Sequence, residues 1–393
     1  MIATVLMGYG VPHNAHDARP GEGSPLSQLL WVLVYVIAFW GVLSERRASA
    51  LVRASLPFVF ILSLAVLSAL WSDDPLSALQ KASGLLGSSV LSLYLVCRLG
   101  LKRFIGTLAI ALAMTAAVSA VLIAFFPDLG FMRDDSGLWK GCFVHKNHLG
   151  LAMVLGMATI ACCGSGARGV RLWAQVAAFL LFLVLLIGSR SSTGLVVAVV
   201  LALLFPLLRR SRSSASYGPA LQGVLVLGAG MLIAVVSGFG LEDVFGVFGK
   251  DLTFTGRTAL WQLAAGAIAD RPLLGYGFGE FFKPGDLNAV LASWTPGQAH
   301  NGFLQVALDL GLAGLALVIQ AFLVGFKRAA ALFWEHRDLA SLWPILAMVY
   351  ILLTNLTEAG LVNVHDVRWI IFVAAFLFAS DAGLKPKGKR LPC

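Results

Sequence analysis

Long apolar segments separated by short polar stretches run along most of the chain. Each is close to the roughly 20 residues that an α-helix needs to cross a bilayer. We expect eleven or twelve transmembrane helices, the count depending on how the shorter segments merge or tilt. The eleven segments are 28–44, 54–71, 83–97, 104–126, 148–164, 172–188, 192–208, 220–238, 302–325, 340–357 and 367–380. The pattern predicts an all-α, polytopic integral membrane protein, with residues 1–393 forming one membrane domain.

The longest hydrophilic stretch, residues 239–300, also has a helical pattern. Apolar residues recur at positions 260, 261, 264, 265 and 268, which is the spacing of an amphipathic helix over Thr258–Asp270. Pro272 disfavours helical geometry in the residue before it, so we expect the helix to end there. Such a helix lies on the membrane surface or covers a cavity.

Composition and charge support a membrane protein and set its orientation. Hydrophobic residues make up 59% of the chain and charged residues only 12%. If the loop 45–53 is cytoplasmic and the spans alternate, eighteen of the 29 lysines and arginines lie on the cytoplasmic side. The net charge of +9 then reflects topology, and no nucleic-acid partner is expected. The loop 239–300 would face outward.

Three polar residues stand out on the outward side. Arg190 lies in the break Gly188–Gly194 between two apolar runs, Arg257 precedes the amphipathic helix, and His300 precedes the span 302–325. Charged residues at membrane depth are costly and mark function by default. Taken singly, each has an ordinary explanation, such as a snorkelling arginine or a loop histidine. Together, two fixed cations and one titratable base suggest chemistry on a lipid-linked diphosphate.

The surroundings of the two arginines suit an anion. Arg257 stands where the helix dipole and unpaired N–H groups already favour negative charge. A guanidinium adds N–H donors in one plane that can hydrogen-bond to two phosphate oxygens at once. Arg190 begins a new apolar run at the outer boundary of the membrane. The glycine-rich run Gly275–Gly279 follows no strand, so we expect a tight turn there and no nucleotide site.

No cluster has convincing metal-ligand spacing. The pairs Asp73-Asp74 and Asp134-Asp135 lack His or Cys partners, and His145 and His148 have no evident third ligand. We therefore expect neither a metal nor another cofactor.

Five segments carry a resemblance to a known family. They are Phe143–Asn147, Ser189–Gly194, Thr255–Trp261, Gly275–Gly279 and His300–Gln305. In this order and spacing they resemble the O-antigen ligase and Wzy-type polymerase superfamily, bacterial inner-membrane glycosyltransferases of the GT-C class. The resemblance is strongest over residues 140–320, the O-antigen ligase-related core. The family's large periplasmic loop would correspond to residues 239–300.

The resemblance implies glycosyl transfer at the periplasmic face. The donor would be a glycan on undecaprenyl diphosphate and the acceptor a sugar hydroxyl. Arg190 and Arg257 would bind the diphosphate, and His300 would act as the base in an inverting, metal-independent displacement. Further donor or acceptor contacts are expected from His145, Lys146, Asn147, Asn301, Gln305 and Glu358.

Two alternatives stay open. A polymerase joins repeat units, whereas a ligase transfers a finished glycan to lipid A-core. The segment Phe143–Asn147 looks more like the exopolysaccharide polymerases and therefore favours a polymerase. Other polysaccharide-assembly proteins are expected as partners. Polar residues within spans, such as Asp309 and Asn355, would also suit a transporter or flippase of the same lipid. The two halves of the chain show no repeat, and the motifs gather on one face, which favours an enzyme.

Overall fold

A computed structural model describes residues 25–132, 137–164, 168–211, 257–282, 297–336 and 338–384. In these residues the protein is all-α, as predicted, with one isolated β-bridge between Phe131 and Trp139. The elements are α2 (Pro25–Leu43), α3 (Ala48–Ala54), α4 (Leu56–Leu67), η2 (Ser68–Leu70), α5 (Pro75–Phe125), α6 (Pro127–Gly130), α7 (Lys146–Ala161), α8 (Val170–Ser189), α9 (Ser192–Ser211), α12 (Arg257–Asp270), α13 (Gly302–Glu335), η4 (Leu339–Leu342), α14 (Trp343–Thr354) and α15 (Val367–Leu384).

Several of these helices suit a membrane by their length and composition. Among the described residues, α2, α5, α8, α9 and α13 are long and apolar enough to cross a bilayer. A sixth candidate is the pair Ala48–Ala54 and Leu56–Leu70, whose two parts are bent by 82°. The other predicted spans correspond to shorter or less apolar helices, and segment 220–238 lies outside the described residues. The protein is therefore a multi-pass membrane protein, while the count of eleven or twelve spans stays a prediction.

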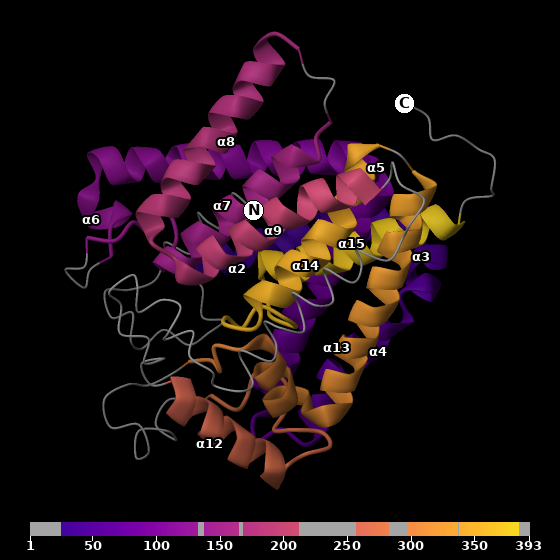
Figure 1. Ribbon diagram of the computed structural model, residues 1–393. Helices are drawn as coiled ribbons and strands as arrows, with labels where there is room; N and C mark the ends of the chain where they lie inside the picture. Colours follow the sequence, from indigo (N-terminus) through magenta and orange to yellow (C-terminus); the bar gives the residue numbers. More distant parts are fainter. Residues whose placement is uncertain are drawn as a thin grey trace.

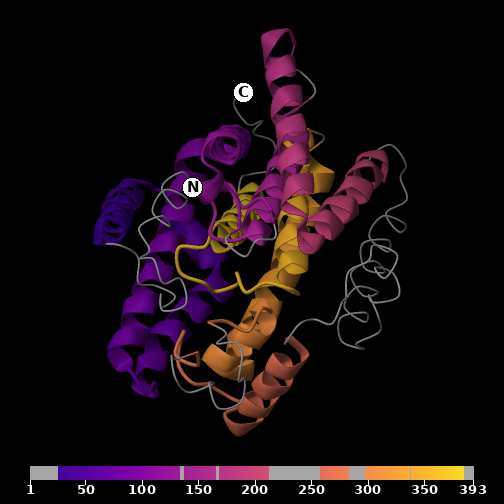
Figure 2. The same cartoon turned by 90° about the vertical axis from the view of Figure 1, so that its left-hand side faces the viewer.

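Two predicted spans, 83–97 and 104–126, form one 51-residue helical element, α5. Its helical geometry is interrupted at Gly100, whose φ of 66° is in the left-handed region. The two halves run in different directions (Figures 1 and 2). The sequence prediction of two helices thus holds, with the polar connection reduced to a kink.

Helices α14 and α15 form the centre of the bundle (Figure 1). Nearly every side chain of α14 is buried, and the aromatic rings of Trp343, Trp369, Phe372 and Phe376 are among the largest fully buried groups. By contrast, α2 and α8 expose long rows of apolar side chains. The interior is thus filled by the C-terminal helices, and the outer helices present apolar surface to lipid.

Helix α13 is broken near its start. Gly311 has a φ of 66° and a ψ of −170°, so the helical hydrogen bonds around it are lost. The segment after α12 fills the gap with four backbone hydrogen bonds: Tyr276 N to Leu308 O (2.8 Å), Gly277 N to Asp309 O (3.0 Å), Leu312 N to Pro272 O (2.8 Å) and Ala313 N to Leu273 O (3.2 Å). The glycine-rich run is therefore a turn, as predicted, and it is fastened to a membrane helix.

The loops sort into two groups that agree with the charge-based topology. Three ion pairs join residues assigned to the cytoplasmic side: Arg47 with Asp381 (3.5 Å), Arg98 with Glu45 (3.2 Å) and Lys102 with Asp338 (3.1 Å). On the side assigned outward, Lys81 pairs with Glu280 at 2.8 Å. Each pair stays within one predicted side. Which side faces the cytoplasm remains a prediction from the positive charges.

Candidate active site

His300 lies in a strained turn at the start of α13. Its φ is 49°, a left-handed conformation that non-glycine residues seldom adopt. The next residue, Asn301, is the N-cap: its side-chain oxygen accepts hydrogen bonds from the backbone N–H groups of Phe303 (3.0 Å) and Leu304 (3.1 Å). This cap fixes the backbone that carries the imidazole.

Gln305 supports the same turn from inside the helix. Its side-chain oxygen accepts a hydrogen bond from the Ala299 N–H at 2.9 Å. Its amide nitrogen donates to both carboxylate oxygens of the buried Asp309, at 3.1 and 3.2 Å. With both ends of its amide engaged, Gln305 holds the backbone before His300. In this structure its role is to position that turn.

The His300 turn docks on the loop between α14 and α15, residues 355–366. The backbone N–H of Gly302 donates to the Asn355 carbonyl at 2.8 Å, and the Asn301 amide donates to the Leu356 carbonyl at 3.3 Å. A Cβ atom on Gly302 would overlap the Asn355 side chain. The sequence Asn301-Gly302 is thus required for close contact between two segments far apart in the chain.

That loop presents Glu358 to His300. The Glu358 side chain is only 4% exposed, and its Oε2 lies 3.7 Å from Nδ1 of His300. Its other oxygen, Oε1, accepts a hydrogen bond of 2.7 Å from the Asn147 side-chain amide. One carboxylate therefore lies between the predicted base and the segment Phe143–Asn147.

The residues around Asn147 start helix α7. His145 is the N-cap, and its Nδ1 accepts a hydrogen bond of 3.2 Å from the Asn147 backbone N–H. Burial lowers the pKa of His145 to about 4, so the ring is neutral near pH 7, as its acceptor role requires. The rings of His145 and His148 lie 6.3 Å apart. Lys146 is half-buried in the first turn of α7.

Arg190 lies at the sharp connection between α8 and α9. It caps the C-terminus of α8 with a φ of 46°, and its side chain is exposed. The serines on either side are buried, and a Cβ atom on Gly150 of α7 would overlap Ser191. The turn is thus packed against α7 through its small residues and presents its one cation outward.

The turn between α8 and α9, Gly188–Gly194, is called the Arg190 turn below, and it also contacts the loop that carries Glu358. The side-chain oxygens of Thr193 and Thr357 are 2.9 Å apart, within hydrogen-bonding distance. Thr357 immediately precedes Glu358. The predicted diphosphate-binding turn and the His300–Glu358 pair therefore meet on one loop.

Arg257 is the first residue of α12, so the helix begins one residue earlier than the sequence predicted. Its side chain lies outside the described part of the structure. One turn later, the Trp261 indole donates a hydrogen bond of 3.0 Å to the Ala299 carbonyl. Leu260 and Ala264 are fully buried, and Ala264 packs with Ala299 and Leu308. The start of α12 is therefore fixed beside the His300 turn.

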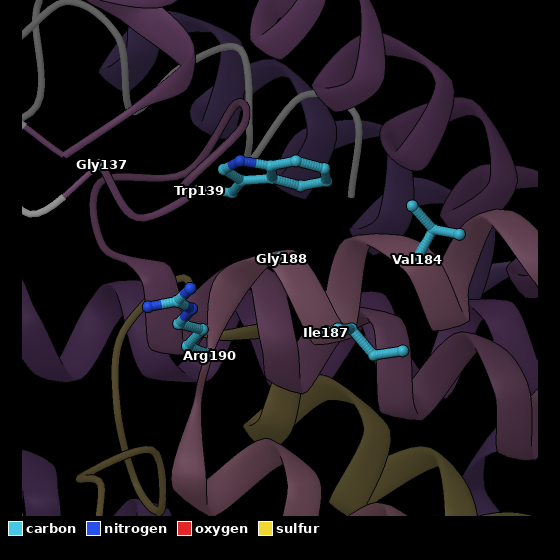
Figure 3. A pocket seen from close by; sticks show the side chains of 6 residues that line it. All are labelled: Gly137, Trp139, Val184, Ile187, Gly188 and Arg190. Atoms are coloured by element: carbon cyan, nitrogen blue, oxygen red, sulfur yellow. The ribbon is translucent and has the colours of Figure 1, made fainter. Parts of the chain in front are cut away.

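A hollow of about 400 Å³ opens next to the Arg190 turn (Figure 3). It is lined by Gly137, Trp139, Val184, Ile187, Gly188 and Arg190. Arg190 lies at one end, and Val184 and Ile187 lie toward the other (Figure 3).

Strained backbone is concentrated in the candidate site. Among the described residues, the non-glycine residues with positive φ are Arg190, His300, Val362 and His365. The first two are the predicted diphosphate ligand and base, and the other two belong to loop 355–366. Such conformations cost of the order of 1–3 kcal/mol each and gather at functional sites, where the surroundings enforce them.

Sequence reasoning identified Glu358 but missed the ion pair that holds its loop. Arg368 is buried, and its Nε donates to both carboxylate oxygens of Asp366 at 3.0 and 3.2 Å. Its terminal nitrogen also donates to the Ala359 carbonyl at 3.3 Å. The sequence does contain the two opposite charges, two positions apart, at the start of an apolar span. They were not read as a buried ion pair because charges at the ends of spans are usually interfacial.

The described residues contain no group of three or more His, Cys, Asp or Glu side chains able to hold a metal ion. Asp74 instead caps α5 by accepting a hydrogen bond from the Ser77 N–H at 3.1 Å. Asp134 and Asp135 lie outside the described residues.

Comparison with known proteins agrees with the motifs. Residues 177–319 match the O-antigen ligase family, Wzy_C. The exopolysaccharide production protein ExoQ of Rhizobium meliloti (strain 1021) is 28% identical over 345 residues, covering 82% of this chain and 75% of that protein. A putative polysaccharide ligase of Rickettsia prowazekii (strain Madrid E) is 38% identical over 71 residues, 16% of this chain and 17% of the relative. A second, from Rickettsia conorii, is 28% identical over 123 residues, 29% and 28% of the two chains.

Proposed function

We propose that this member of the O-antigen ligase and polymerase-like superfamily is a glycosyltransferase that uses a glycan on undecaprenyl diphosphate as donor. It transfers the glycan to a sugar hydroxyl at the periplasmic face of a bacterial inner membrane. The observation that carries the proposal is the meeting of His300, Glu358 and the Arg190 turn on loop 355–366.

In this proposal His300 is the general base. Its Nδ1 faces the Glu358 carboxylate, so Nε2 is the nitrogen that accepts the proton of the acceptor hydroxyl. The separation of 3.7 Å is longer than a hydrogen bond, and catalytic hydrogen bonds commonly shorten when substrate binds. A buried carboxylate beside the ring fixes its orientation and stabilises the imidazolium that forms.

The arginines act on the leaving group. The acceptor oxygen forms a bond to the anomeric carbon while the bond from that carbon to the diphosphate oxygen breaks. The proton passes to His300, and the electron pair leaves with the lipid diphosphate. Arg190 and Arg257 stabilise the negative charge that develops there. A single displacement of this kind inverts the anomeric configuration, and its charge balance needs no metal.

The remaining polar residues hold this arrangement. Asn147 donates a hydrogen bond to one carboxylate oxygen of Glu358, and the other oxygen faces His300. Asn301 and Gln305 fix the His300 backbone. His145 and Lys146 are proposed to contact the donor or acceptor from the start of α7.

The names of the relatives support one acceptor class over the other. The match that spans most of the chain is to a protein named for exopolysaccharide production, which favours polymerisation of repeat units. The two shorter matches are to proteins named as putative polysaccharide ligases, which keeps transfer to lipid A-core as the second candidate.

The test is transfer by the purified full-length protein in detergent, where no ion gradient exists. One undecaprenyl-diphosphate repeat unit is supplied with and without lipid A-core. A ladder of longer glycans without lipid A-core supports a polymerase, and a product only with lipid A-core supports a ligase. His300→Ala should abolish either product, whereas His336→Ala, at the opposite end of α13, should not. No transfer in any arm, together with lipid movement across vesicles, would support a flippase instead.

A further inference from the structure

Asp309 is a buried carboxylate that the proposed mechanism does not use. It lies on α13, two residues before the break at Gly311, and it is only 4% exposed. Among the described residues, the charged groups that act on it are Lys81 of α5 and Glu280, which form an ion pair at 2.8 Å. One cation thus serves two carboxylates, so an ionised Asp309 needs hydrogen-bond donors of its own.

Gln305 supplies such a donor, and the carboxylate determines which way its amide points. The amide nitrogen lies 3.1 and 3.2 Å from the two oxygens of Asp309, a nearly symmetrical arrangement that suits an ionised carboxylate. Because an ionised carboxylate only accepts hydrogen bonds, the NH2 group of Gln305 must face it. The amide oxygen then points the opposite way, where it accepts from the Ala299 N–H at 2.9 Å.

The Ala299 N–H depends on the orientation of this amide. Ala299 is fully buried, and a buried N–H that loses its acceptor is costly. A reversed Gln305 amide would place its NH2 group against the Ala299 N–H, donor against donor. The next residue is His300, whose φ of 49° persists only while its surroundings enforce it. The acceptor character of Asp309 therefore acts, through one amide, on the backbone of the proposed base.

Both ends of this chain of hydrogen bonds are anchored to other elements. The Ala299 carbonyl accepts from the Trp261 indole at 3.0 Å, which attaches the turn to α12. The Asp309 carbonyl accepts from the Gly277 N–H at 3.0 Å, which attaches it to the glycine-rich turn. Asp309 is thus held where Gln305 reaches it, and Ala299 is held on both sides of its own residue.

We infer that Asp309 is a positioning residue for His300, which rests on the proposed role of His300 as the base. The negative charge of Asp309 orients the Gln305 amide, and the amide oxygen holds the Ala299 N–H. Ala299 in turn holds His300 beside Glu358. The property required at position 309 is a hydrogen-bond acceptor that does not also donate.

The test changes the polarity of the pair in the purified full-length protein and measures transfer. Asp309→Asn keeps almost the same shape, but its amide also donates and allows Gln305 to reverse, so kcat should fall about tenfold or more. The KM for the lipid-linked donor should stay nearly unchanged, because Arg190 lies on a separate turn. Asp128→Asn, the same change at an exposed position on α6, is the matched control and should keep the wild-type kcat.

The double variant Gln305→Glu with Asp309→Asn restores the polarity in the opposite sense. The carboxylate at position 305 accepts from both the Ala299 N–H and the amide at position 309, so most of the lost kcat should return. Gln305→Glu alone places two carboxylates together and should lose at least as much activity as Asp309→Asn. A side chain that only fills space would not be rescued by a second change that is itself damaging.

The outcomes separate this inference from the proposed function. Wild-type kcat in Asp309→Asn would overturn the inference, as would a double variant no more active than Asp309→Asn. If Asp309→Asn does not fold, as judged by size-exclusion chromatography in detergent, the double variant must recover both folding and turnover, and its failure would also overturn the inference. The proposed function fails differently, because His300→Ala would then retain turnover or the wild type would form no product.

Discussion

Oε2 of Glu358 lies 3.7 Å from Nδ1 of His300, although the two residues belong to segments on opposite sides of α14 in the chain. Their approach depends on the contact between Gly302 and Asn355. Only a glycine at position 302 leaves room for the start of α13 to pack against loop 355–366. The carboxylate's second oxygen is held by Asn147. The base is therefore assembled from three separate segments.

Glu358→Gln should lower the turnover number by about 10²-fold, within the range for loss of assistance to a general base. The amide keeps the shape and still accepts from Asn147, but it cannot stabilise a protonated His300. Donor affinity should be nearly unchanged, because Glu358 faces the base. The measurement is kcat and KM separately, with Glu335→Gln on the far end of α13 as the control. Normal turnover would remove Glu358 from the mechanism.

Arg190→Ala and Arg257→Ala should each reduce the transfer rate by about 10²–10³-fold, equivalent to about 2.7–4 kcal/mol of transition-state stabilisation. Lysine at either position should restore only part of the rate, since an ammonium cannot make the paired contact. Arg209→Ala, at the exposed end of α9, should behave as the wild type. Full activity in either alanine variant, at normal protein levels, would contradict a diphosphate clamp.

Arg368→Ala should destabilise the protein by about 3–5 kcal/mol, because it leaves Asp366 partly buried without its cation. The double change Asp366→Asn with Arg368→Met should recover much of this loss, since no charge is then left unpaired. Thermal unfolding in detergent measures both variants. If the double variant were as unstable as Arg368→Ala, the hydrogen bond to Ala359 rather than the ion pair would be the main support of the loop.

Acidification should destabilise the protein through His145. Burial lowers its pKa from 6.5 to about 4, so the unfolded chain binds a proton more readily between those values. The contribution is complete above pH 6.5 and is lost as the pH falls toward 4, at most about 3.5 kcal/mol at about 1.4 kcal/mol per pKa unit. His145→Asn keeps a capping side chain that does not titrate. The drop in melting temperature between pH 7.5 and 4.5 should be smaller in this variant than in the wild type or in His336→Asn.

Transfer should survive excess EDTA, because the proposed mechanism stabilises the leaving diphosphate with two guanidinium groups. The assay is product formation by protein dialysed against chelator, with and without added magnesium or manganese. Loss of activity that either ion restores would redirect attention to Asp73, Asp74, Asp134 and Asp135.

The sequence was most informative where periodicity is strong. Apolar runs predicted most helices within a few residues, and the spacing over Thr258–Asp270 predicted α12 together with its end. The Gly311 break and the pairing of Asp366 with Arg368 were missed. The break depends on contacts with a distant segment, and a continuous apolar run gives no indication that its helix is interrupted. The ion pair is local, but it lies at the start of an apolar span, where charges are usually interfacial.

The break in α13 also bears on how the protein is made. Within a bilayer, the backbone groups around Gly311 find no water, and their partners come from residues 272–277, which precede the helix in the chain. Insertion of α13 alone would leave these groups exposed to lipid. Maturation of this helix is therefore tied to the return of the outward segment, so that the His300 turn and its supporting helix are completed in one step of biogenesis.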